Sequence, residues 1–145
     1  MSTESDQAHY YTSVMGDEQK VLTVRRSLRA LGFQPEVFKR SASQKKSKGV
    51  DITLTKDMLV NAFHDNYDVA VLIAGDGDYV PVVEELKRMG KAVHVAFFSE
   101  KGAGLSDEIR LRCDKFFSLS ELFENCWKSA GKQAGLSKGL REAKA

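Results

Sequence analysis

Residues 71–79, with the sequence Val-Leu-Ile-Ala-Gly-Asp-Gly-Asp-Tyr, decide the fold of this chain. An apolar run typical of a buried β-strand leads into a glycine-rich turn that carries Asp76 and Asp78, and a helical pattern follows. In open α/β sheets, ligands bind at the carboxyl ends of the strands. Two aspartates there, between glycines that let the backbone bend, can bind a hard cation such as Mg²⁺ or Mn²⁺. An Asp-Gly turn with a helix N-cap is the ordinary structural alternative.

Strand and helix patterns alternate on both sides of this stretch. The sequence predicts strands at Ala8–Val14, Phe33–Phe38, Val69–Ala74, Lys91–Phe98 and Phe116–Leu119. It predicts helices at Glu18–Leu31, from Asp51 to a frayed end near His64–Asn66, from Pro81 to Met89, at Ser106–Arg112 and from a Ser120 cap to Trp127. Such alternation predicts βαβ units and a mostly parallel sheet. The continuous apolar run from Val69 to Ala74 predicts a strand covered on both faces.

Composition indicates one ordinary globular domain. The chain has 145 residues, of which 42% are hydrophobic and 29% charged. Its apolar runs are too short to span a membrane, and its N-terminus lacks the apolar region of a signal peptide. The spacing of Cys113 and Cys126 fits neither a disulfide framework nor a zinc site, so we expect a cytoplasmic protein. We divide it into a polar segment 1–7, a domain 8–127 and a basic, loose or weakly helical tail 128–145.

A second acidic group follows Lys48-Gly49-Val50. Asp51 stands where we expect a helix to begin, so an N-cap or first-turn acid is its ordinary explanation. Asp57 lies six positions further on, about 240° around a helix. The two carboxylates therefore do not share a face, and Asp57 is more easily a structural acid or one that supports the ligands of an ion.

Four segments together carry a family resemblance: residues 48–57, 67–83, 86–93 and 105–119. With Lys-Gly-Val-Asp, Ala-Gly-Asp-Gly-Asp-Tyr and Cys-Asp-Lys-Phe-Phe at these spacings, the chain closely resembles the NYN domain (LabA-like) family of the PIN-like nuclease superfamily. The resemblance covers about residues 8–123. It rests on the spacing from Asp51 to Asp78, because a lone Gly-Asp-Gly-Asp is not specific.

The resemblance implies a three-layer α/β/α domain in which an acidic cluster binds Mg²⁺ or Mn²⁺ and cleaves RNA. Asp51, Asp76 and Asp78 match acidic positions of that cluster, and Asp57 matches a further family acid whose role is less defined. Carboxylates alone would repel a phosphate. One or two bound ions reverse the local charge, activate water and stabilise the charge that develops on the phosphorus oxygens.

One feature departs from the family pattern. The family opens with a central strand of the form apolar-apolar-Asp-x-x-Asn, and nothing before Ala8 matches it, whereas Ala8–Val14 resembles the family's second strand. We therefore expect a sheet that lacks its N-terminal strand, has one site acid fewer and self-associates through exposed edges. The chain is either a fragment, or has a misassigned start, or is a natural variant that lacks one ligand.

The stretch 39–48 holds five cations and no acid, and we expect it to bind RNA phosphates through Lys45, Lys46 and Lys48. A solvated loop is the alternative, because no aromatic residues are interleaved there. We expect single-stranded RNA as the partner and no membrane. The rival to a metal-dependent ribonuclease is a catalytically reduced RNA- or protein-binding module on the same fold. A small-ligand sensor is a third reading.

Overall fold

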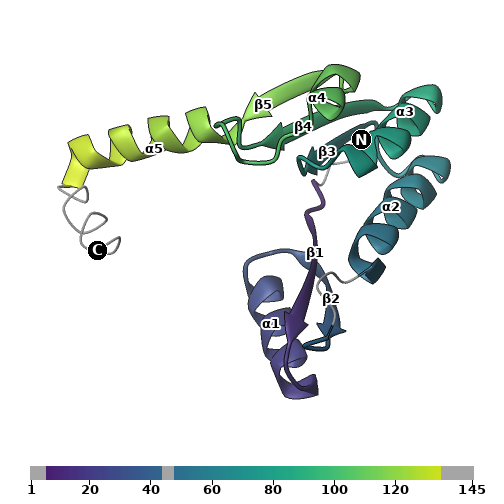
Figure 1. The fold of residues 1–145 in the computed structure, drawn as a ribbon, viewed down its shortest axis with the longest axis vertical. Coiled ribbons are helices and arrows are strands. Elements are labelled where there is room, and N and C mark those ends of the chain that lie inside the picture. Colours follow the sequence, from purple (N-terminus) through teal and green to yellow (C-terminus); the bar gives the residue numbers. More distant parts are fainter. Residues whose placement is uncertain (1–5, 44–47, 135–145) are drawn as a thin grey trace, which may run out of the picture. The chain divides into compact units, whose positions relative to one another are not determined.

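The computed structural model describes residues 6–43 and 48–134 (Figure 1). The chain divides into two compact units, Met1–Val60 and Asn61–Ala145. Each unit has its own parallel sheet.

The first unit contains β1 (His9–Met15), α1 (Glu18–Ala30), β2 (Gln34–Arg40) and α2 (Lys48–Phe63), the last of which belongs to it as far as Val60. The strands β1 and β2 are parallel, with His9 opposite Gln34 and Met15 opposite Arg40. Parallel pairing requires a crossover, and α1 supplies it.

The ends of α1 follow from its sequence. Asp17 is the N-cap, and its carboxylate accepts a hydrogen bond from the backbone N–H of Lys20 at 3.0 Å. Gly32 follows the helix with φ of +92°, a left-handed conformation that favours glycine. Val21 of α1 and Val37 of β2 are buried and form the small core of this unit.

The second unit contains three strands: β3 (Val69–Ile73), β4 (Ala92–Phe97) and β5 (Lys115–Ser118). Its helices are the 3-10 turn η1 (Gly77–Tyr79) and α3 (Val80–Arg88), α4 (Asp107–Arg112) and α5 (Leu119–Ala134). The order in the sheet is β3-β4-β5, and both pairs are parallel. As predicted, Pro81 lies in the first turn of α3, and Gly90 follows that helix with positive φ.

One face of this sheet carries the core of the second unit. Five side chains from α3, β4 and α4 are fully buried, namely Val83, Leu86, Val93, Val95 and Ile109. On the opposite face, Val69, Val71 and Ile73 of β3 remain 47%, 62% and 67% exposed. The prediction that this strand is covered on both faces is therefore wrong, because α3 and α4 pack on a single face.

The predicted α/β class with parallel strands is confirmed. Among the described residues the strands form two sheets, in which β1 pairs only with β2 and β3 pairs only with β4. Each sheet therefore has an edge strand with unpaired backbone groups on one side.

Two helices begin earlier than predicted. Helix α2 begins at Lys48, so Asp51 is a first-turn acid, which is one of the two roles that the sequence allowed, and not the N-cap. Helix α5 begins at Leu119, and the hydroxyl of Ser118 accepts a hydrogen bond from the N–H of Glu121 at 3.3 Å, in place of the predicted Ser120 cap. The same helix runs to Ala134, so residues 128–134 of the predicted tail are helical, while 135–145 lie outside the described residues.

Candidate active site

The acidic turn follows β3 directly, and both of its carboxylates are exposed. Asp76 is extended, with φ of −76° and ψ of 128°, and caps η1. Its Oδ1 accepts a hydrogen bond from the backbone N–H of Asp78 at 2.9 Å. The capping role that the sequence allowed for Asp76 is thus present. The Oδ2 of Asp76 and the carboxylate of Asp78 make no hydrogen bond or ion pair with another described residue.

Close packing explains the two glycines of this turn. Neither Gly75 nor Gly77 has a left-handed φ, so a sharp bend of the backbone is not what requires them. A β-carbon on Gly75 would lie 2.3 Å from Cδ1 of Phe97, and one on Gly77 would lie 3.0 Å from Oγ of Ser106. The turn is glycine-rich because an aromatic ring and a serine side chain pack directly against its backbone.

A backbone hydrogen bond fixes the turn to a neighbouring segment. The N–H of Ser106 donates to the carbonyl of Gly75 at 2.8 Å, immediately before α4 begins. Tyr79 is only 8% exposed and packs in the core, so its ring is not available to stack on a base. The two aspartates therefore lie on a supported turn at the carboxyl end of β3.

Asp51 and Asp57 both lie on α2, in the first unit. Asp51 is exposed in the first turn of this helix. Oδ2 of Asp57 accepts a hydrogen bond from the hydroxyl of Tyr11 on β1 at 2.8 Å, and Oδ1 lies 3.1 Å from Nζ of Lys56. Burial and then the hydrogen bond to Asp57 raise the pKa of Tyr11. Asp57 therefore joins α2 to β1, which is a structural role.

The predicted phosphate-binding lysines fall mostly outside the described part of the chain. Lys45 and Lys46 lie outside it, and Lys48 is the first residue of α2. In the preceding strand, Nζ of Lys39 lies 3.7 Å from the carboxylate of Glu18. This exposed pair adds little stability.

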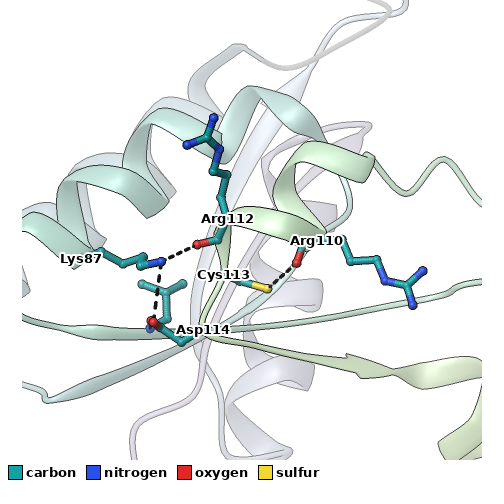
Figure 2. A network of polar contacts seen from close by, with 6 residues as sticks. Lys87, Arg110, Arg112, Cys113 and Asp114 are labelled. Carbon is teal, nitrogen blue, oxygen red and sulfur yellow. Dashed lines mark hydrogen bonds and ion pairs between the residues drawn. The ribbon is translucent and has the colours of Figure 1, made fainter.

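The opposite end of the three-stranded sheet carries a separate polar network (Figure 2). Oδ2 of Asp114 accepts a hydrogen bond from the N–H of Val93 at 2.7 Å, and Nζ of Lys87 lies 3.7 Å from Oδ1 of Asp114 and donates to the carbonyl of Arg112 at 2.8 Å. The bond from Val93 and the nearby Lys87 lower the pKa of Asp114. Because Val93 and Asp114 lie at the starts of β4 and β5, this network fixes strands and is not part of the acidic turn.

Three further properties bear on function. Burial raises the pKa of the Cys113 thiol, which disfavours the reactive thiolate. Within residues 6–43 and 48–134, no three His, Cys, Asp or Glu side chains gather in one place. In that same part of the chain, every helix is too short or too polar to cross a bilayer.

Parallel α/β architecture with an acidic turn at the carboxyl end of β3 is consistent with a PIN-like nuclease fold. The sequence matches the NYN domain model over residues 2–121, so the chain belongs to the NYN domain family. A solved crystal structure of a protein of unknown function from Vibrio parahaemolyticus is similar, with a TM-score of 0.57 and 26% identity. The match covers 78% of this chain and 68% of that one. No curated protein matches the sequence.

Sequence reasoning missed the residues that surround the acidic turn. Phe97 packs on Gly75, Ser106 packs on Gly77, and Phe98 follows the end of β4. A signal for the two phenylalanines was present, since residues that follow a parallel strand lie on its ligand-binding end. Ser106 had no such signal, because its position depends on how the 99–106 segment returns to β3.

Proposed function

We propose that this protein is a metal-dependent ribonuclease that hydrolyses RNA phosphodiester bonds with Mg²⁺ or Mn²⁺. The observation that carries the proposal is the exposed pair Asp76 and Asp78, placed directly after a strand of a parallel sheet. Strand ends of this kind are where α/β proteins bind their ligands. Membership in the NYN family supports phosphodiester cleavage over other chemistry at this end of the sheet.

The oxygen donors of the turn fit a hard cation. Mg²⁺ and Mn²⁺ prefer carboxylate oxygens and keep several waters. Asp78 offers both carboxylate oxygens and Asp76 offers Oδ2, since its Oδ1 is engaged by the N–H of Asp78. That hydrogen bond holds Asp76 in one orientation, so the loss of side-chain freedom on binding is reduced. The family resemblance adds Asp51 and, with a less defined role, Asp57 to this proposal.

Charge determines the role that we propose for the ion and for each group of residues. Aspartates alone repel a phosphodiester, and a bound ion supplies positive charge and a more acidic water. In this proposal Asp76 and Asp78 bind and orient the ion. Gly75 and Gly77 let the backbone of the turn pack against Phe97 and Ser106. Lysines 45, 46 and 48 supply affinity for phosphates without reading bases, which suits a single-stranded RNA substrate.

Calorimetric titration with Mn²⁺ tests the site. The variant Asp76→Asn/Asp78→Asn removes both charges but keeps the cap, because asparagine accepts the same hydrogen bond. It should lose Mn²⁺ binding and Mn²⁺-dependent cleavage of a single-stranded oligoribonucleotide, and it should fold at least as stably as the parent without metal. Asp68→Asn is the matched control, since Asp68 is an exposed acid at the other end of the same strand. Equal Mn²⁺ binding by the double variant and the parent would overturn the proposal.

The second candidate is a catalytically reduced RNA- or protein-binding module on the same fold. It is favoured by the structural hydrogen bonds that two of the acids already make, Asp76 with the N–H of Asp78 and Asp57 with Tyr11. Salt-sensitive RNA binding without Mn²⁺-dependent cleavage would support this candidate, because phosphate contacts weaken steeply with ionic strength.

A further inference from the structure

A row of three phenylalanine rings begins beside the acidic turn. Phe97 ends β4, Phe98 follows it, and Phe123 lies near the start of α5. The ring centroids of Phe97 and Phe98 are 5.8 Å apart in an edge arrangement. Those of Phe98 and Phe123 are 6.0 Å apart, with an angle of 17° between the ring planes. The rings of Phe98 and Phe123 are therefore nearly parallel and stacked.

The row is continuous with the acidic turn. The ring of Phe97 packs against Gly75 so closely that a β-carbon there would lie 2.3 Å away. Gly75 immediately precedes Asp76 in the chain, so the first ring of the row touches the residue before the carboxylates. Phe98 and Phe123 then extend the row from β4 to α5, and all of these residues belong to the second unit.

The two rings of the row that lie further from the acidic turn, Phe98 and Phe123, are exposed, although the unit has a buried hydrophobic core. Phe98 is 37% exposed and Phe123 is 42% exposed, whereas five aliphatic side chains of the core are fully buried. The backbone after Phe98 is also fixed to the start of α5. Ser99 donates its N–H to Oγ of Ser120 at 3.1 Å, and its hydroxyl lies 2.6 Å from Oγ of Ser118. The exposed pair is therefore held in place before any ligand binds.

We propose that Phe98 and Phe123 form a stacking subsite for a nucleobase of single-stranded RNA, next to the phosphodiester that the acidic turn addresses. This inference rests on the proposed function. Aromatic rings bind the π-face of every base, so the subsite adds affinity with little sequence preference. It also sets which phosphate lies at the turn, because the stacked base and the scissile bond belong to one strand.

Fluorescence anisotropy with an end-labelled single-stranded oligoribonucleotide tests the subsite, with Ca²⁺ in place of Mn²⁺ to retain the strand. Phe98→Leu and Phe123→Leu should each bind about 5- to 100-fold more weakly. Phe98→Trp should bind as tightly as the parent or more tightly. Phe117→Leu is the matched control, because Phe117 is 51% exposed in the same unit but contacts His94 and not the row. Thermal melting confirms that each variant is folded.

An abasic oligonucleotide makes the test specific to stacking. Moving one abasic position along the strand should weaken binding by the parent at one place, and Phe98→Leu should abolish that minimum. Unchanged affinity of both leucine variants, or an equal loss in Phe117→Leu, would overturn the subsite while leaving Mn²⁺-dependent cleavage by the parent intact. Failure of the parent to bind RNA would overturn the subsite and the proposed function together.

Discussion

The two units differ most in how much each can bury. The first unit has a two-stranded sheet and two buried hydrophobic residues, Val21 at 5% and Val37 at 6% exposure, among its described residues. The second has a three-stranded sheet and five side chains that are fully buried. Two-stranded sheets are marginal in isolation, whereas three strands packed on helices support an independent core. The second unit is therefore the more stable part of the molecule.

This difference also separates the acids by environment. In the second unit, Asp76 and Asp78 lie on an exposed turn supported by a closed core. In the first, Asp57 connects a helix to a strand through Tyr11. Preorganised ligands need a rigid support. The turn after β3 is thus better suited to bind an ion than the α2 acids are, unless the first unit is stabilised by binding or by association.

Truncation of the core should give the largest contrast between the units. Leu86→Ala removes a fully buried side chain of the second unit and should cost about 2–5 kcal/mol. Val21→Ala in the first unit should cost about 1–2 kcal/mol, since it removes fewer carbon atoms than Leu86→Ala does and the core around it is smaller. Urea unfolding measures the change in the free energy of unfolding of each variant. Amide hydrogen exchange, compared between α3 and α1, shows which unit opens more readily. Equal protection of the two helices in the parent would contradict the comparison.

Alanine should be costly at one glycine of the chain and tolerated at another. Gly75→Ala places a β-carbon into the ring of Phe97 and should cost about 1–3 kcal/mol. Gly49→Ala in α2 meets the ring of Phe38 only at 3.4 Å and should be neutral or stabilise by up to about 1 kcal/mol, because alanine favours the helix. Thermal melting measures both. A stabilised Gly75→Ala protein would mean that the turn does not pack on Phe97.

The open edge of β3 should drive weak self-association. Val69, Val71 and Ile73 are exposed along a strand that pairs on one side only among the described residues. Val71→Lys should shift the protein toward monomer in sedimentation velocity at unchanged stability, because charge on an edge strand opposes pairing. Leu111→Lys is the control, since Leu111 is 80% exposed on α4, away from the edge. If the parent is a monomer at high concentration, the edge is protected and this prediction is wrong.

Most helices and strands could be predicted from the sequence, because the spacing of hydrophobic residues and the positions of glycine and proline indicate the same element boundaries. Gly32 and Gly90 end helices at the expected places, and the parallel strands follow from their alternation with helices. The acidic turn was predicted from residues adjacent in the chain. Two features could not be predicted in this way: the packing of Phe97 that requires glycine at position 75, and the ring pair of Phe98 and Phe123. Both depend on side chains that only folding brings together, and the local sequence pattern does not encode such contacts. Nor does it encode the exposed face of β3, since a continuous apolar run cannot show which face has a partner.

The smallest expected effect belongs to the hydrogen bond that joins α2 to β1. Tyr11→Phe removes the hydroxyl that donates to Asp57 and should cost about 0.5–1.5 kcal/mol near neutral pH. The pKa of Tyr11 is raised in the folded protein, so its neutral form is favoured there. This contribution is complete below pH ~10, the ordinary tyrosine value, and is lost as pH rises through the folded pKa. Melting temperatures of the parent and Tyr11→Phe should therefore converge in alkali. Tyr10→Phe is the matched control on the same strand, since Tyr10 is 44% exposed and should melt like the parent throughout. A difference that stays constant across the pH range would contradict the assignment of this effect to the neutral hydroxyl that donates to Asp57.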